Sequence, residues 1–332
     1  MASSSISRRQ FAAFSVASSA IWMCHNSISA PLNGGVWPTK ALRLLVGFPA
    51  GSTPDTTARV LADGLARVLG QPVVVENRPG AAGNIAADLV AKSTDGHTFG
   101  VLINGNLTSA KLLNPRLPYD PDRDFSFISL LTAAPLLLVT QASEPAGAAF
   151  FVAAKAAGAR WNYGSVGNGS VAHLGMELLK SKVPGLDAVH VPFGGNPQVA
   201  TALIAGQIQM ALLPPGIALP QIRAGKLRAI GLTGSRSTLV PEVPSLAELG
   251  IPDYALEVIN ALVGPASLPA GAVARLSNAT VEVLRAPENR QRLFHHGWQA
   301  IGTAPEGLEN RIRKEAAQLG AIIRKQGIRL DS

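Results

Sequence analysis

Two short segments rich in glycine and hydroxyl side chains contain the residues best suited to bind an anion. The first covers residues 47–55 (GFPAGSTPD) and the second covers residues 163–170 (YGSVGNGS). Small residues let backbone N–H groups approach a ligand, and a serine or threonine in each segment can cap a following helix, whose dipole favours negative charge. The available hydroxyls are those of Ser52, Thr53, Ser165 and Ser170. If the loops face each other across a cleft, they could hold one or two carboxylates.

The two loops have two other interpretations, a structural one and a nucleotide site. Each loop could be a plain tight turn with a helix cap, and the sequence leaves this open. Residues 167–169 (GNG) resemble part of a phosphate loop, but neither loop matches GxGxxG or GxxxxGK[ST]. We therefore do not expect a nucleotide site.

The residues needed for catalysis or metal binding are not arranged in a recognisable pattern. The chain has no Gly-x-Ser-x-Gly elbow and no HExxH pair. Asp55, Ser170 and His173 are the best candidates for an exported enzyme, and they are poor ones. His173 follows the second loop and could point a donor at a ligand, although such a histidine is more often part of a core or a helix surface. We expect no catalytic residue, no metal and no cofactor.

The first 29 residues resemble a twin-arginine export signal. Arg8 and Arg9 precede a mildly apolar run to Met23, and small residues follow, with cleavage expected after Ser29. Cys24, the single cysteine, lies inside this segment, so the exported chain would contain no thiol. We expect a soluble periplasmic protein with its signal removed; a plain cytoplasmic N-terminus is the alternative.

Composition supports a folded protein that does not bind nucleic acid. Of the 332 residues, 47% are hydrophobic and 15% are charged, which is enough apolar material for two domains. The net charge of +8 is spread along the chain, without the basic and aromatic runs of a nucleic-acid groove.

Alternating strand and helix patterns should position the two loops. Strands are expected at 43–48, 73–76 and 98–103, with helices at 54–69 and 85–92. A second alternating series covers residues 162–233, and helices are expected at 270–284, 288–296 and 306–325. These patterns predict an α/β fold with two doubly wound lobes and a hinge, like the clamshell of periplasmic binding proteins. Lobe 1 is expected at 40–138 plus 264–332, and lobe 2 at 139–263.

Several segments resemble the Bug family of periplasmic solute receptors, which serve tripartite tricarboxylate transporters. They are residues 43–49 (RLLVGFP), 72–84 (PVVVENRPGAAGN), 117–121 (LPYDP), 162–170 (NYGSVGNGS), 190–193 (HVPF) and 224–229 (AGKLRA). The resemblance covers nearly all of the chain after the export signal. It implies a receptor that closes on a small carboxylate, a di- or tricarboxylate or an aromatic acid, through the two loops and bound water.

Carried over by position, the resemblance implies ligand contacts from both loops and from two further strand ends. The implied residues are Phe48, Gly51, Ser52, Thr53, Asp55, Asn104, Gly105, Ser165, Gly167, Asn168, Gly169, Ser170, His173 and Phe193.

The chain departs from the family pattern at several of these positions. Ser52 replaces the second glycine of a usual pair, Phe193 and Gly194 replace a tyrosine and a long basic residue, and Leu213 replaces a frequent aspartate. These changes suggest a less polar cavity and a carboxylate ligand without an ammonium group, for which aromatic acids are candidates.

The resemblance also implies a partner. A membrane permease of the tripartite tricarboxylate type would accept the ligand, or a sensor protein would receive it, and we expect the receptor to be a monomer. An effector domain of a transcription regulator shares the two-lobed architecture, but the export signal occupies the end where its DNA-binding helices would be.

Overall fold

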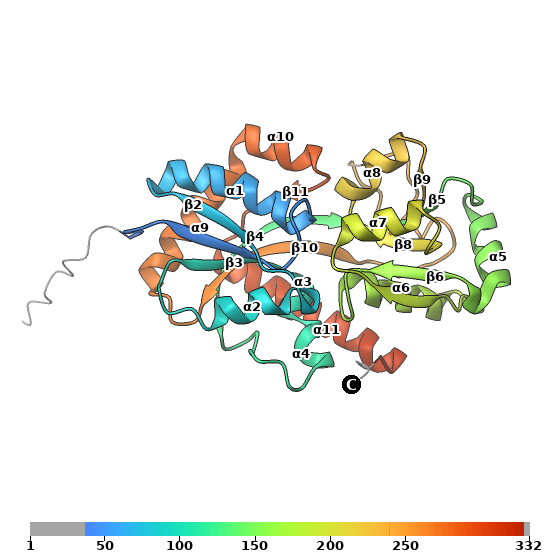
Figure 1. Ribbon diagram of the computed structural model, residues 1–332, viewed down its shortest axis with the longest axis horizontal. Helices are drawn as coiled ribbons and strands as arrows, with labels where there is room; N and C mark the ends of the chain where they lie inside the picture. The colour runs from blue at the N-terminus through green and yellow to red at the C-terminus, as the bar shows by residue number, and fades with distance from the viewer. Residues whose placement is uncertain (1–36, 239, 329–332) are drawn as a thin grey trace, which may run out of the picture. The chain divides into compact units, whose positions relative to one another are not determined.

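The structure, a computed structural model, describes residues 37–238 and 240–328 (Figure 1). The expected export signal, with Cys24 and the cleavage position, lies outside the described residues. Two β-sheets with helices packed around them make up the described chain, which confirms the expected α/β two-lobed fold class.

The first sheet has six strands in the order β11-β4-β10-β3-β1-β2. Strand β1 pairs in parallel with β2 and β3, whereas β10 pairs antiparallel with β3 and β4. Its strands are β1 (Leu42–Val46), β2 (Val73–Asn77), β3 (Thr98–Ile103), β4 (Phe125–Pro135), β10 (Glu257–Pro265) and β11 (Gln299–Ala300). Strands β1 and β3 are almost wholly buried and apolar, as expected of parallel strands covered on both faces.

Seven helices belong with this sheet, and we call the assembly lobe 1. They are α1 (Thr53–Leu69), α2 (Asn84–Ala91), α3 (Asn104–Leu107), α4 (Ser109–Leu113), α9 (Ala270–Arg285), α10 (Pro287–His295) and α11 (Pro305–Gln326), with the 3₁₀ turn η1 (Ala81–Gly83) before α2. The three C-terminal helices cover lobe 1 as expected, and α11 also reaches α6 of the second lobe.

The second sheet has five strands in the order β7-β6-β8-β5-β9, and with its helices forms lobe 2. The strands are β5 (Leu137–Gln141), β6 (Asn162–Ser165), β7 (Val189–Pro192), β8 (Met210–Leu213) and β9 (Leu227–Leu232). The helices are α5 (Ala148–Ala157), α6 (Val171–Lys182), α7 (Asn196–Ile204) and α8 (Pro215–Arg223), and the 3₁₀ turn η2 (Gly158–Arg160) follows α5.

The strand pairing favours a lobe boundary that differs from the one expected at residue 263. Strand β10 lies in the first sheet because it pairs with β3 and with β4 along its length, from Glu257 opposite Pro135 to Pro265 opposite Phe125. The second sheet begins at Leu137, since Leu136 alone separates β4 from β5. We therefore propose lobe boundaries near residues 136 and 256.

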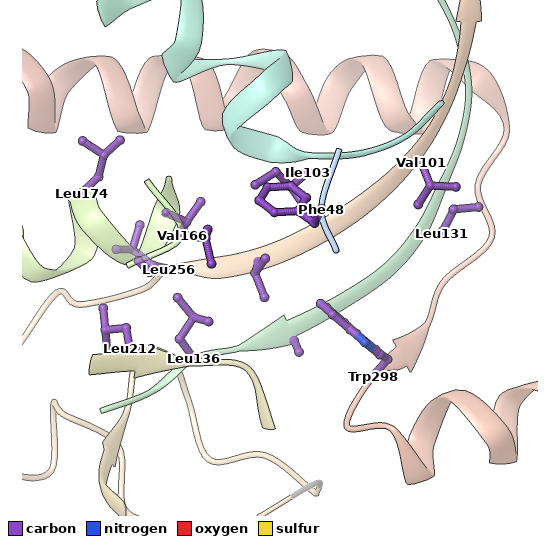
Figure 2. Packing of buried hydrophobic residues seen from close by; sticks show 14 of the residues in the cluster. Phe48, Val101, Ile103, Leu131, Leu136, Val166, Leu174, Leu212, Leu256 and Trp298 are labelled. Carbon is purple, nitrogen blue, oxygen red and sulfur yellow. The ribbon is translucent and has the colours of Figure 1, made fainter. Parts of the chain in front are cut away.

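The two chain crossings are tied together at the hinge. The backbone N–H of Leu136 donates to Thr233 Oγ1 over 2.9 Å, and the Thr233 hydroxyl donates to the Leu256 carbonyl over 2.6 Å. Figure 2 shows apolar side chains gathered where the strands cross, including Phe48 and Ile103 from lobe 1 and Leu212 from lobe 2. These residues belong to one buried cluster, so the apolar core is continuous between the lobes.

A buried asparagine seats α1, which carries the first loop, on the sheet. Asn260 in β10 is fully buried, and its Nδ2 donates to Thr57 Oγ1 in α1 over 3.0 Å and to Thr132 Oγ1 in β4 over 2.9 Å. Hydrogen bonds of buried groups fix a unique arrangement because leaving one partner unsatisfied is costly.

Replacing this asparagine should destabilise lobe 1. Asn260→Ala removes two donors and leaves a small cavity, so we expect the free energy of unfolding to fall by about 1–3 kcal/mol. Asn278→Ala, at an exposed position of α9, is the control and should change it by less than about 0.5 kcal/mol. Urea unfolding measures both, and equal stability of the two variants would contradict this role.

Candidate functional site

The first loop leaves β1 at Val46 and enters α1 at Thr53. Gly51 adopts φ +77°, a conformation that side chains rarely tolerate, and this turns the chain into the helix. Ser52, Thr53 and Phe48 are buried, and the ring of Phe48 lies so close to Gly83 that a Cβ there would be 2.8 Å from its Cε2.

Asp55 holds this loop in shape. Its carboxylate accepts hydrogen bonds from the Gly51 backbone N–H (2.9 Å), from Asn77 Nδ2 (2.9 Å) and from two nitrogens of Arg59 (both 3.0 Å). Burial raises the pKa of Asp55, but the hydrogen bonds from Arg59, Asn77 and Gly51 outweigh it, so the net pKa lies below its ordinary value. The carboxylate is therefore ionised and fully engaged, and its role here is to fix the loop.

Ser52 contributes a polar group that the protein does not use. Its side chain stands at the N-cap position of α1 but makes no capping hydrogen bond. The residue is 1% exposed, and Ser52 Oγ has no hydrogen-bond partner within the described residues. Burying a hydroxyl without a hydrogen-bond partner destabilises the folded protein, and a hydrogen bond from this hydroxyl to a ligand oxygen at the helix end would offset that cost.

The second loop runs from β6 to α6 and is fixed by its own side chains. Ser165 Oγ lies 2.7 Å from His190 Nε2 and 3.1 Å from both the N and the O of Gly167. Ser170 caps α6, because its Oγ accepts from the His173 backbone N–H over 3.3 Å. Gly167 and Gly169 adopt φ +119° and +80°, so this loop requires glycine at both positions.

His173 lies beneath the second loop. Its Nδ1 accepts the Gly169 N–H over 3.1 Å, and its ring lies 4.2 Å from that of His190. Burial lowers the pKa of both histidines, and burial together with the nearby charges of His173 and Lys180 lowers that of His190 to about 3. The rings are therefore neutral near pH 7, and together they support the loop from below.

A pocket of about 400 Å³ lies between the two lobes, next to both loops. Among the described residues, its lining contains no charged side chain, and lobe 1 and lobe 2 both contribute to it. The lining residues are Gly47, Gly80, Ala81, Ala82, Gly83, Asn84, Asn114, Val166, Gly167, Asn168, Pro192, Phe193 and Gly194. We call this space the cleft pocket, and its volume suits a small ligand.

A second, much smaller cavity of about 20 Å³ adjoins the cleft pocket, since Val166 lines both. Asn104, Ser170 and Asn196 are its polar residues. Asn104 Nδ2 donates to the Glu257 carbonyl (3.0 Å) and to the Glu315 carboxylate of α11 (2.8 Å), while its buried Oδ1 has no partner among the described residues. A space of this volume is large enough for about one water molecule.

The lobes touch beside these cavities. Ser109 Oγ in α4 donates to the Gly169 carbonyl of the second loop over 2.6 Å. A Cβ at Gly105 would lie 3.5 Å from the same carbonyl oxygen, so Gly105 packs directly against the loop. Asn104 and Gly105 therefore lie where the two lobes meet.

Some of the predicted site residues line one of the two cavities, and the others line neither. Gly167, Asn168 and Phe193 line the cleft pocket, and Asn104 and Ser170 line the small cavity. The other predicted residues line neither space: Phe48, Gly51, Ser52, Thr53, Asp55, Gly105, Ser165, Gly169 and His173. Among the positions where the chain departs from the pattern of the family it resembles, Leu213 is buried in the core of lobe 2, and Phe193 is half-buried against that core.

Residues 80–84 form one wall of the cleft pocket, which was not predicted from the sequence. Ala81 and Ala82 adopt φ +48° and +54°, and α2 begins just after them. Each such backbone conformation costs free energy, and conformations of this kind are found mostly at functional sites. The run GAAGN of small residues before a helix was the available signal, and it was used only for the resemblance.

Asp55 should make the stability of the protein depend on pH in acid. Its folded-state pKa lies below the ordinary 3.8, so its contribution is present above that pH and is lost as the pH falls through the folded-state value. Asp55→Asn should cost about 1–3 kcal/mol at pH 7, and the difference from wild type should shrink at pH 3.

Urea unfolding at both pH values measures this effect. Asp63→Asn is the control, because Asp63 is on the same helix but its side chain is 61% exposed and pairs with Arg292 at the surface. A difference between wild type and Asp55→Asn that does not change between pH 7 and pH 3 would contradict the account.

The sequence is similar to a known family of receptors and to individual proteins. The family model described as "Tripartite tricarboxylate transporter family receptor" matches residues 57–328. BugT of Bordetella pertussis is 30% identical over 93% of this chain and 96% of its own length. A UPF0065 protein from the gbd 5' region of Cupriavidus necator is 32% identical over 88% of this chain and 89% of its own length.

Two solved structures that contain a dicarboxylate are also similar. MatC of Rhodopseudomonas palustris, solved with malate, has a TM-score of 0.81 and 31% identity over 86% of this chain and 99% of that one. The R. palustris protein Rpa4515, solved with adipate, has a TM-score of 0.85 and 28% identity over 88% and 99%. The chain belongs to the receptor family of the tripartite tricarboxylate transporters.

Proposed function

We propose that this receptor binds a small carboxylate in the cleft pocket and in the small cavity next to it, which Asn104, Ser170 and Asn196 line. The observation that carries the proposal is a pocket lined by both lobes, without a charged side chain among its described residues, at the loops that lead into α1, α2 and α6. In such a site, backbone N–H groups and helix dipoles take the place of a positively charged side chain. Ser52 lines neither cavity, but its Oγ is buried at the start of α1 without a partner among the described residues, and it would add a hydroxyl for a ligand that extends to this helix end.

The ligand is best described as a carboxylate without an ammonium group. The receptors solved with malate and adipate make dicarboxylates the first candidates. In the described part of the chain, no acidic residue lines the cleft pocket to pair with an amine, and Phe193 adds an aromatic surface. Aromatic acids are therefore the next candidates.

We also propose that the protein works by capture and release without chemistry. Ser165 and His190 have the geometry of a nucleophile and base, at 2.7 Å. However, Ser165 is 1% exposed and its Oγ already bonds within the loop. The pair therefore stabilises the loop, and this favours binding over hydrolysis.

The proposed setting is the periplasm, with a separate membrane partner. No helix in the described part of the chain is long and apolar enough to cross a membrane. Export through the N-terminal signal, action as a monomer and delivery to a tripartite-type permease are parts of the proposal; delivery to a sensor protein is the alternative for the last step.

A thermal-shift screen of the chain from residue 30 onward tests ligand binding. The panel contains mono-, di- and tricarboxylates, aromatic acids and amino acids. A ligand at a hundred times its Kd adds about 2.7 kcal/mol of stability, so a true ligand raises the Tm by several degrees. Stabilisation by aspartate or glutamate alone would contradict the ligand class, and stabilisation by nothing in the panel would contradict the proposed function.

Ser52→Ala separates ligand binding from folding. Because Ser52 Oγ bonds to no described residue, its loss should leave the Tm without ligand nearly unchanged while it weakens carboxylate binding about tenfold, as expected for one hydrogen bond to a charged group. Ser181→Ala, at an exposed position of α6, is the control. Unchanged affinity in Ser52→Ala would remove Ser52 from the site.

A further inference from the structure

The lobes also touch at a second place, where the backbones of two glycines meet. Gly216 is the second residue of α8 in lobe 2, and Gly297 follows α10 in lobe 1. Figure 1 shows α8 and α10 on one side of the crossing strands and α4, which contacts the second loop, on the other. The contact between Gly216 and Gly297 is therefore separate from the one between Ser109 and Gly169.

Neither glycine has room for a side chain. A Cβ on Gly216 would overlap the carbonyl oxygen of His296 and lie 2.8 Å from its carbonyl carbon. A Cβ on Gly297 would overlap the backbone nitrogen of Gly216 and lie 2.8 Å from the carbonyl carbon of Pro215. All of these neighbours are backbone atoms, which cannot rotate away as a side chain can.

The local structure of α8 does not itself require glycine at 216. Gly216 does not have a positive φ, whereas Gly297 has φ +77°. Glycine in a helix is less favourable than alanine by up to about 1 kcal/mol. The requirement for glycine at 216 therefore comes from the other lobe.

We infer that Gly216 is a positioning residue for ligand capture, because the absence of its side chain lets the two lobes come together around the ligand. The inference rests on the proposed function, since it assumes that the ligand is held by both lobes. A methyl group at 216 would act as a wedge that holds α8 and α10 apart. A receptor that reaches its binding arrangement less often binds with a proportionally weaker apparent affinity.

The chain offers a closely matched control for this wedge. Gly271 is the second residue of α9, the same helix position that Gly216 has in α8, and a Cβ there would meet nothing within 4 Å. Gly271→Ala therefore repeats the change in helix propensity without the contact between lobes.

The experiment compares wild type, Gly216→Ala and Gly271→Ala by calorimetric titration with malate and adipate. We expect Gly216→Ala to raise the Kd about tenfold or more, chiefly through faster release, with its Tm without ligand unchanged or raised. Gly271→Ala should keep the Kd within about twofold of wild type. X-ray scattering should give Gly216→Ala a larger radius of gyration than the control, with and without carboxylate.

The outcomes separate this inference from the proposed function. If wild type binds and Gly216→Ala binds equally tightly, the inference is wrong. It is also wrong if Gly216→Ala lowers the Tm without ligand, because the contact would then belong to the fold rather than to capture. If wild type binds neither probe nor any other carboxylate, the proposed function fails. The scattering comparison still tests whether a methyl group at 216 holds the lobes apart, because equal radii of gyration for Gly216→Ala and Gly271→Ala would show that it does not.

Discussion

A charged carboxylate can be held in a pocket without charged side chains only if hydrogen-bond donors replace the water that it loses. The cleft pocket has this character, because its lining is glycine, alanine, asparagine, valine, proline and phenylalanine. The donors must then come largely from backbone N–H groups at loops and helix starts, and their directions depend on loop shape. The rest of the site is organised around keeping those loops rigid.

Each loop is held by residues that lie outside the pocket. Asp55 gathers Gly51, Arg59 and Asn77 around the first loop. Under the second loop, His190 and His173 bond to Ser165 and Gly169. The positions implied by the family resemblance therefore include residues that shape the loops as well as residues that line the cavities. Mutation of either kind would weaken binding, but the first kind would also change stability.

The helices and the parallel strands of the two lobes could be predicted because periodicity and capping are local signals. Residues 54–69 were expected as a helix, and α1 covers Thr53–Leu69. No strand was expected at residues 125–135 or 257–265, and only the pairing between these two segments reveals them as sheet. The same pairing is the reason for proposing a lobe boundary near residue 256 in place of 263.

The functional loops were equally visible in the sequence, but the roles of their residues were not. The resemblance implied that Asp55, Ser165 and His173 meet the ligand, which stays a prediction. The structure adds that their side chains bond to the loops, and the sequence did not indicate this. The wall at residues 80–84 and the contact of Gly216 with Gly297 depend on segments far apart in the chain. Spacing and residue type alone do not report such contacts.

The most direct test of the central claim is a crystal structure of the chain from residue 30 onward with the carboxylate that stabilises it most. We expect the carboxylate between the two loops, with one oxygen within hydrogen-bond distance of Ser52 Oγ or of a backbone N–H at the start of α1, and with contacts from residues 166–170 of lobe 2. A carboxylate bound to one lobe alone, or away from both loops, would contradict the account.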